Sequence, residues 1–264
     1  MEGRNTKILP LVEQLAQQGG DARRAVLLKI LGEIGLPFCV CQDGEAQNIS
    51  VRLNKGDRYF IVAAHYDVCD DCNNSTGAND NASGVAVLLA LLKRYRRRRP
   101  KVPLEFVFFD LEERTKAREG QYGSRRYVER IDRKEIKGMI NLDMCGIGEM
   151  VVLGPRKNAR RVPWREPMKG MPKSSSDVVD CMPKSDDRSF EAKKIPNISI
   201  CILPKDDFDL FQSWSCRPTA NRPSIRETMH GGKRDSVREI QEDALTTVFT
   251  WVSNFVGLLG GESC

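Results

Sequence analysis

Short apolar runs in the middle of the chain each end at residues that can bind a proton or a metal. The run 61–64 leads to His65, and the run 106–109 leads to Asp110 and two glutamates. Both runs are continuous and β-rich rather than alternating, which is typical of strands buried on both faces. Between them, the apolar stretch 84–92 predicts a helix. Strand, helix and strand in this order predict a βαβ unit, which places its functional loops at the carboxyl ends of the strands.

The sequence before this unit predicts two helices and a hairpin. Apolar residues at helical spacing cover 8–17 and 22–34, and Gly35 follows the second segment as a C-cap. The segments 37–41 and 48–53 flank an Asp-Gly turn, which predicts a hairpin at a sheet edge.

The sequence after the unit predicts further strands and helices around one segment without a clear period. Strands are expected at 137–144, 149–153 and 198–203, and helices from Gly123 and over 243–259. The segment 155–190 is rich in Lys, Arg, Pro and Ser. A structureless loop of that length is unusual in a compact domain, so this segment either holds short elements or is mobile.

The composition of the 264 residues, with 40% hydrophobic and 30% charged residues, is typical of an ordinary globular protein. No apolar run approaches the length of a membrane span, and the first residues lack the apolar core of a signal peptide. The nine cysteines have no framework spacing, so we expect them to be reduced and the protein to be cytoplasmic. Cys69 and Cys72 flank Asp-Asp and could be a redox pair or a metal site, but inert loop thiols are the expectation.

The net charge of +6 raises the question of a nucleic-acid partner. The densest basic run, 93–99, lies at the end of the expected helix, where cations complement the helix dipole. No nucleic-acid motif accompanies it. We therefore expect neither a nucleic-acid nor a membrane partner.

The chain contains two histidines, His65 and His230. Asp67 lies two residues after His65, and such a carboxylate can orient an imidazole whose other nitrogen binds a metal. His230 has no such neighbour, and a lone histidine is often structural.

Acidic residues lie at three further strand or helix ends. Asp80 lies in a Gly- and Asn-rich loop, where the alternative is a helix N-cap. Glu112 and Glu113 follow a buried strand, and neighbouring carboxylates repel each other unless a cation or a proton separates their roles. The alternative is a solvated acidic turn. Asp143 again follows an apolar run. Together with the histidines, these residues form a nitrogen and oxygen ligand set suited to zinc.

These residues lie in motifs that resemble the zinc aminopeptidases of peptidase family M28. The matching pieces are His65-Tyr-Asp67, Gly77-Ala-Asn-Asp80-Asn-Ala-Ser-Gly84, Phe108-Phe-Asp-Leu-Glu112-Glu113, Gly123-Ser124, Asn141-Leu-Asp143-Met, Ser185-Asp186, Ile195-Pro196, and His230 with Asp235. The resemblance implies one domain over residues 1–264, an α/β three-layer sandwich with a mixed, mostly parallel sheet between helices.

The resemblance also implies two zinc ions per chain. Asp80 would bridge them, His65 and Glu113 would complete one, and Asp143 and His230 would complete the other.

The implied reaction is hydrolysis of the N-terminal bond of a peptide or small aminoacyl substrate. Glu112 would be the general acid/base, and Asp67 would support His65. Phe208, Phe211 and Trp214 could line a pocket for the first side chain, or they could be core residues. The sequence departs from the family pattern after His230, where two glycines follow.

Two other functions remain open at this stage. A one-zinc acyltransferase of the glutaminyl-cyclase type shares the fold, but the ligand set that includes His65 argues against it. A non-catalytic binding protein with the same fold is disfavoured by the presence of Glu112 beside all five ligands.

Overall fold

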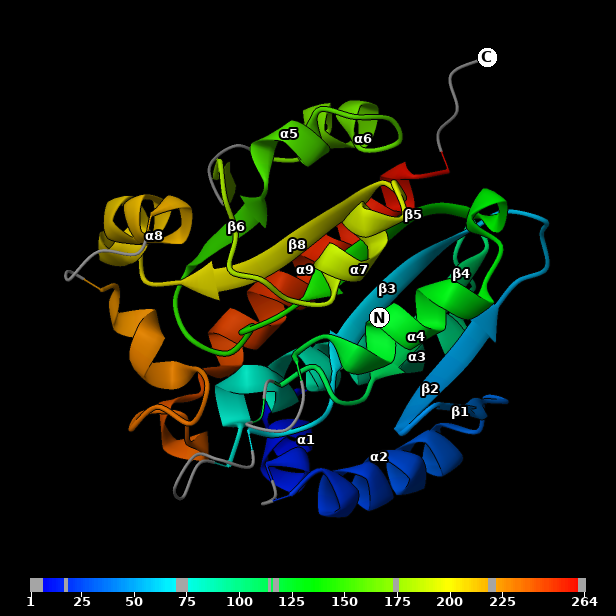
Figure 1. Cartoon of the computed structure of the whole chain (residues 1–264), viewed down its shortest axis with the longest axis horizontal. Helices are drawn as coiled ribbons and strands as arrows, with labels where there is room; N and C mark the ends of the chain where they lie inside the picture. Colours follow the sequence, from blue (N-terminus) through cyan, green and yellow to red (C-terminus); the bar gives the residue numbers. More distant parts are fainter. Residues whose placement is uncertain are drawn as a thin grey trace, which may run out of the picture.

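A single eight-stranded sheet accounts for all strands of the described chain (Figure 1). The computed structural model describes residues 7–16, 19–69, 76–113, 115, 119–172, 176–217 and 222–260. The strands are β1 Cys39–Asp43, β2 Ala46–Leu53, β3 Tyr59–His65, β4 Leu104–Phe109, β5 Ile136–Leu142, β6 Met150–Gly154, β7 Ser176–Val178 and β8 Asn197–Leu203. Their order is β1-β2-β4-β3-β5-β8-β6-β7.

The central strands β4, β3, β5 and β8 run parallel to one another. The pairs β1–β2, β2–β4 and β6–β8 are antiparallel, and β6–β7 is parallel. The sheet is therefore mixed and mostly parallel in its centre, which confirms the expected fold class. The hairpin predicted around the Asp-Gly turn is also confirmed, because β1 is an edge strand paired only with β2 among the described strands.

Helices cover both faces of this sheet (Figure 1). The longer ones are α1 Leu9–Leu15, α2 Gly20–Ile34, α3 Gly84–Arg97, α4 Tyr122–Arg130, α8 Phe208–Cys216 and α9 Glu242–Leu258. The side chains of β3 alternate between two clusters, since Phe60, Val62 and Ala64 pack with α1, α2, α3 and α9. Tyr59, Ile61 and Ala63 pack instead with α4 and with the short helix α7 Asp187–Ala192. This alternation follows from the period of two in a strand, and it produces the three layers.

The segment 155–190 contains short elements in its described parts. They are α5 Arg156–Ala159, α6 Arg165–Lys169, β7 and the start of α7 Asp187–Ala192. Trp164, between α5 and α6, is fully buried against Phe60 and Phe255. Of the two alternatives for this segment, the short elements are therefore the correct one.

A disulfide joins Cys181 to Cys216 at the end of α8, with 5.1 Å between their Cα atoms. Cys69 is also disulfide-bonded, whereas Cys72 lies outside the described residues. The expectation that the cysteines are all reduced is thus wrong for Cys69, Cys181 and Cys216. The free cysteines of the described chain are Cys39, Cys41, Cys145 and Cys201. None of the helices described here is long and apolar enough to cross a membrane.

We expect Cys216→Ser to lower the free energy of unfolding by about 4 kcal/mol, because the bridge closes a loop of 35 residues and restricts the unfolded chain. Cys39→Ser, which removes an exposed free thiol, is the matched control and should change stability by less than about 0.5 kcal/mol. Denaturant unfolding of both variants without reductant measures the difference. Equal midpoints for the two variants would contradict the prediction.

Candidate metal centre

The predicted site residues lie at one edge of the sheet, after the carboxyl ends of three neighbouring parallel strands. His65 ends β3, Glu112 and Glu113 follow β4, and Asp143 follows β5. Carboxyl ends of parallel strands share an edge, so the fold brings these side chains together. His65, Glu112 and Glu113 are buried, and Asp143 is partly buried.

Asp80 reaches this edge from the turn that precedes α3, a turn that includes non-helical dihedral angles at Asp80 itself. Asp235 fixes the turn, because its Oδ1 accepts hydrogen bonds from the backbone N–H of Asn79 at 2.7 Å and of Asp80 at 3.3 Å. Asn81 joins the turn to β5, donating from Nδ2 to the carbonyl of Leu142 at 2.8 Å. The start of α3 lies so close to β5 that a Cβ at Gly84 would lie 2.8 Å from the same carbonyl oxygen.

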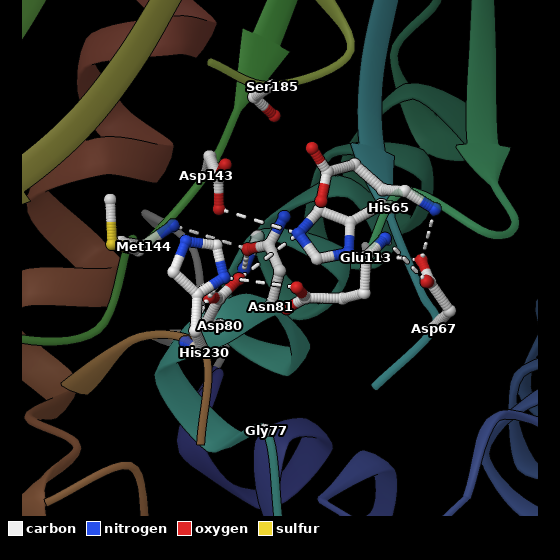
Figure 2. Close-up of polar contacts among 12 residues, drawn as sticks. His65, Asp67, Gly77, Asp80, Asn81, Glu113, Asp143, Met144, Ser185 and His230 are labelled. Carbon is white, nitrogen blue, oxygen red and sulfur yellow. Dashed lines mark hydrogen bonds and ion pairs between the residues drawn. The ribbon is translucent and has the colours of Figure 1, made fainter. Parts of the chain in front are cut away.

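The two carboxylate oxygens of Asp80 face two different groups of side chains (Figure 2). Oδ1 lies 3.2 Å from Nε2 of His65, and that nitrogen lies 3.6 Å from Oδ1 of Asp143. Oδ2 lies 3.7 Å from Nδ1 of His230, which lies 3.0 Å from Oε2 of Glu113. Within each group the three ligand atoms lie within 4.8 Å of one another. All five expected ligand side chains thus converge, with Asp80 common to both groups.

The grouping differs from the one implied by the resemblance. His65 lies with Asp143, and His230 lies with Glu113, so the expected pairings of His65 with Glu113 and of Asp143 with His230 are wrong. The backbone explains the position of His230, because its N–H donates to Oδ2 of Asp80 at 2.8 Å. This hydrogen bond holds the imidazole on the Glu113 side of Asp80.

These two groups fit cations better than they fit an empty pocket. Oε1 of Glu113 and Oδ1 of Asp143 are buried and accept no hydrogen bond from any residue that the structure describes. Three carboxylates and two imidazoles, all oxygen or nitrogen donors, are ligands that zinc commonly takes. His65, Asp80 and Asp143 would hold one ion, and Asp80, Glu113 and His230 would hold a second.

The pKa values of the imidazoles reflect this concentration of negative charge. Burial alone would lower the pKa of His65, but the neighbouring carboxylates of Asp143, Asp67 and Asp80 raise it well above the usual value. Burial likewise lowers the pKa of His230, whereas the hydrogen bond to Glu113 and the charge of Asp80 raise it to about 9. The surrounding carboxylates thus favour positive charge at both positions.

Asp67 positions both His65 and the two glutamates. Its Oδ1 lies 3.2 Å from Nδ1 of His65, so Nε2 of the ring points toward Asp80 and Asp143. The same oxygen accepts the N–H of Glu112 at 3.0 Å, and Oδ2 accepts that of Glu113 at 2.9 Å. One buried carboxylate therefore sets the ring of a ligand and the loop that carries Glu112 and Glu113.

We expect Asp67→Asn to weaken zinc binding about 10–100-fold, because the amide no longer provides the negative partner that orients His65. Competition with a chromogenic chelator measures the affinity. Asp110→Asn is the matched control, since the side chain of Asp110 is also buried nearby but bonds the backbone of Gln47 and Leu111 rather than a ligand. Equal zinc affinities in the two variants would contradict the positioning role.

Glu112 differs from Glu113 in that it belongs to neither ligand group. Its Oε1 accepts a hydrogen bond from Nε2 of Gln121 at 2.8 Å, which fixes the carboxylate beside the two groups. Burial raises its pKa well above the usual value, His65 opposes this, and Asp186 adds to it. A buried carboxylate with a raised pKa is suited to exchanging protons.

Asp186 is a functional candidate to which the sequence analysis assigned no role. It is fully buried, and neither carboxylate oxygen has a hydrogen-bond partner within the described part of the chain. Burial raises its pKa to about 7. The only sequence signal was its place in the Ser185-Asp186 piece. Ser185 itself accepts a hydrogen bond from Nδ2 of Asn141 on β5, which anchors this segment beside the site (Figure 2).

The aromatic residues proposed for a side-chain pocket have separate positions. Trp214 lines a cavity that also includes His230. Phe211 is fully buried in a cluster with Met144, and Phe208 packs against that cluster. Only Trp214 therefore faces the cavity beside the metal-binding groups.

Relatives of known structure share this architecture. A zinc aminopeptidase from Bacillus subtilis superimposes with a TM-score of 0.62 and 21% identity, covering 80% of this chain and 49% of that one. A glutaminyl cyclase from Bacteroides thetaiotaomicron gives a TM-score of 0.71 and 19% identity, covering 97% of each chain. At these identities the likeness establishes the fold alone.

Relatives found by sequence match a smaller part of this chain than the structural neighbours do. A probable zinc metalloprotease from Pyrenophora teres f. teres is 34% identical over 97 residues, which are 34% of this chain and 20% of that protein. The matched part thus covers only about a fifth of that relative's length. The model of the family described as peptidase family M28 matches residues 48–256, which include every residue of the two candidate metal-binding groups. The chain therefore belongs to peptidase family M28, a family of zinc metallopeptidases.

Proposed function

We propose that this protein is an aminopeptidase that holds two zinc ions and hydrolyses the N-terminal bond of a peptide. The observation that carries the proposal is the position of Asp80, whose two oxygens each face a separate group of ligands. A carboxylate shared in this way suits a pair of metal ions. When bound, the two ions would polarise the scissile carbonyl and lower the pKa of a water molecule.

Glu112 is the residue proposed to move protons. It is buried, it belongs to neither candidate ligand group, and Gln121 holds its carboxylate in place. It would accept a proton from water and then deliver it to the amine of the leaving group. Asp67 would hold His65 and the loop of Glu112 in position during this transfer.

A glutaminyl-cyclase activity is the second candidate, because a glutaminyl cyclase is among the structural neighbours that cover nearly all of the chain. Such an enzyme would need one metal ion, whereas the group of His65, Asp80 and Asp143 supports a second. A non-catalytic binding role is disfavoured by a buried proton carrier beside both groups.

Two measurements test the proposal. The first is the zinc content of the purified chain, where we expect two ions per chain. The second is the rate on aminoacyl anilides compared with the rate of cyclisation of peptides that begin with glutamine. One ion per chain with cyclisation as the main activity would overturn the proposal, and zinc-loaded protein inactive in both assays would favour the binding role.

The disulfide Cys181–Cys216 supports an oxidising compartment, because such bonds persist there and are rare in the cytoplasm. It therefore argues against the cytoplasmic location expected from the cysteine count. Counting alkylatable thiols before and after reduction, on protein taken directly from cells, would decide between them. All nine cysteines reactive without reduction would favour the cytoplasm.

A further inference from the structure

A cavity of about 730 Å³ adjoins the metal-binding groups. His230, a member of the second group, and Gln121, which bonds Glu112, both line it. A substrate bound at the metal centre would therefore extend into this cavity. Its volume lies within the range of about 300–1,000 Å³ that is usual for small-molecule sites.

The lining of this cavity is strongly basic. Four of its side chains are cations, namely Arg125, Lys184, Arg188 and Arg226. Glu119 is the one acidic residue among the described lining residues, and it pairs with Arg125 at 3.5 Å where both side chains are exposed. Such an exposed pair is weak, so the cations dominate the field inside the cavity.

Three of these cations have few or no partners in the described chain. The Nη2 of Arg188 donates to the carbonyl of Met182 at 3.3 Å, while its Nε is buried without a hydrogen bond. The side chains of Lys184 and Arg226 make neither a hydrogen bond nor an ion pair with described residues. Guanidinium and ammonium groups whose donors lack a partner among the described residues are suited to a carboxylate, which can accept hydrogen bonds from several of them.

Two walls of the cavity are fixed to each other. Met182 and Lys184 follow Cys181, while Trp214 precedes Cys216, and the disulfide joins these two segments. The Oγ of Ser215 also donates to the carbonyl of Cys181 at 3.0 Å. Lys184 thus lies on a preformed wall, and Arg188 bonds the carbonyl of Met182 on the same wall, which reduces the entropy lost on binding.

We infer that this cavity binds a carboxylate of the substrate, so that the enzyme prefers short peptides with an acid group next to the bond that is cut. The inference rests on the proposed peptidase function and specifies its substrate class. The carboxylate can come from an acidic side chain or from the free C-terminus of a dipeptide. Trp214 and Met229 provide apolar contacts for the carbon atoms beside that carboxylate.

The test compares acidic substrates with neutral isosteres on the zinc-loaded protein. Glutamyl anilide against glutaminyl anilide tests the side chain, and leucyl-alanine against leucyl-alaninamide tests the C-terminus. We expect the acidic member of at least one pair to have a kcat/KM at least tenfold higher, mainly through a lower KM. Equal kcat/KM values within both pairs would overturn the inference.

The double variant Lys184→Gln, Arg226→Gln assigns the preference to this cavity. We expect it to reduce the acidic-to-neutral ratio at least tenfold. The double variant Arg165→Gln, Lys193→Gln removes the same charge from exposed residues that do not line the cavity, and it should keep the ratio. A ratio that survives in the first variant, or that falls equally in both, would also overturn the inference.

A binding measurement separates this inference from the proposed function. Calorimetry of glutarate against glutaramide on the same zinc-loaded proteins requires no hydrolysis. We expect glutarate to bind at least tenfold more weakly to the cavity variant than to the control. If the protein hydrolyses no substrate but shows this difference, the proposed function fails, whereas the inferred carboxylate site in the cavity holds. Glutarate held by the metal ions alone would bind both variants equally, and the inference would then fail.

Discussion

Glu112→Gln should lower kcat by about 10²–10⁴ while zinc content stays at the wild-type value. The amide keeps the size of the carboxylate and can still bond Gln121, but it cannot accept the proton of the attacking water. Because Glu112 belongs to neither ligand group, its replacement leaves all five candidate ligand side chains in place. KM should change much less than kcat, since a proton carrier acts mainly in the transition state.

Glu113→Gln is the matched comparison, because it makes the same substitution one residue along the same loop. Glu113 contacts His230 at 3.0 Å and belongs to the second ligand group, so its amide should bind zinc more weakly. Zinc per chain and kcat should be measured on both variants. A Glu112→Gln protein with near wild-type kcat would contradict the role of Glu112 as proton carrier. A Glu112→Gln protein that loses zinc as Glu113→Gln does would show that Glu112 acts as a ligand instead.

Arg23→Met should lower the free energy of unfolding by at least about 4 kcal/mol. Arg23 is fully buried in α2, and its guanidinium donates to five backbone carbonyls. Those carbonyls belong to Leu15, Tyr66, Asp67, Thr76 and Gly77. Methionine has a similar length but no donor, so these acceptors would lose a partner, at about 1–3 kcal/mol for each one that stays buried and unsatisfied.

The position of these carbonyls adds a second effect to the same variant. They lie at the end of α1, in the loop that carries Asp67, and in the turn before Asp80. Arg23 thus connects the segments that hold two site residues, and burial lowers its pKa only to about 10, so it stays charged at neutral pH. We therefore expect zinc affinity to fall together with stability.

Lys29→Met provides the control for Arg23, since Lys29 is an exposed cation on the same helix. It should change the free energy of unfolding by less than about 0.5 kcal/mol. Urea unfolding and chelator competition on both variants measure the two effects. If Arg23→Met were as stable as Lys29→Met, the buried hydrogen bonds would not have the proposed weight.

The sequence alone predicted the central elements within a few residues of their ends. The runs 61–64 and 106–109 lie within β3 and β4, and 84–92 lies within α3. These predictions succeed because the period of apolar residues is a local property of the chain. The same local pattern identified the candidate ligands at strand ends, since a polar residue directly after a buried strand is visible without the tertiary structure.

Which distant side chains lie together at the site was decided only by the fold. The sequence could not show that His65 lies with Asp143 rather than with Glu113, because β3 has β4 on one side and β5 on the other. Both neighbours offer a carboxylate at the same edge. The choice follows from side-chain direction and from the backbone of His230, which bonds Asp80 across 150 residues.

The sequence likewise does not show which basic residues are buried and which are exposed. Arg23 and Lys29 both lie in the expected helix 22–34, yet one is fully buried and the other is exposed. The sequence also could not show the disulfide between Cys181 and Cys216, because no local pattern indicates which two distant thiols lie close together. Apolar periodicity determines which segments form strands and helices, because it acts between near neighbours. The partner of a charge or a thiol depends on how those segments pack, and packing brings together residues that no local pattern relates.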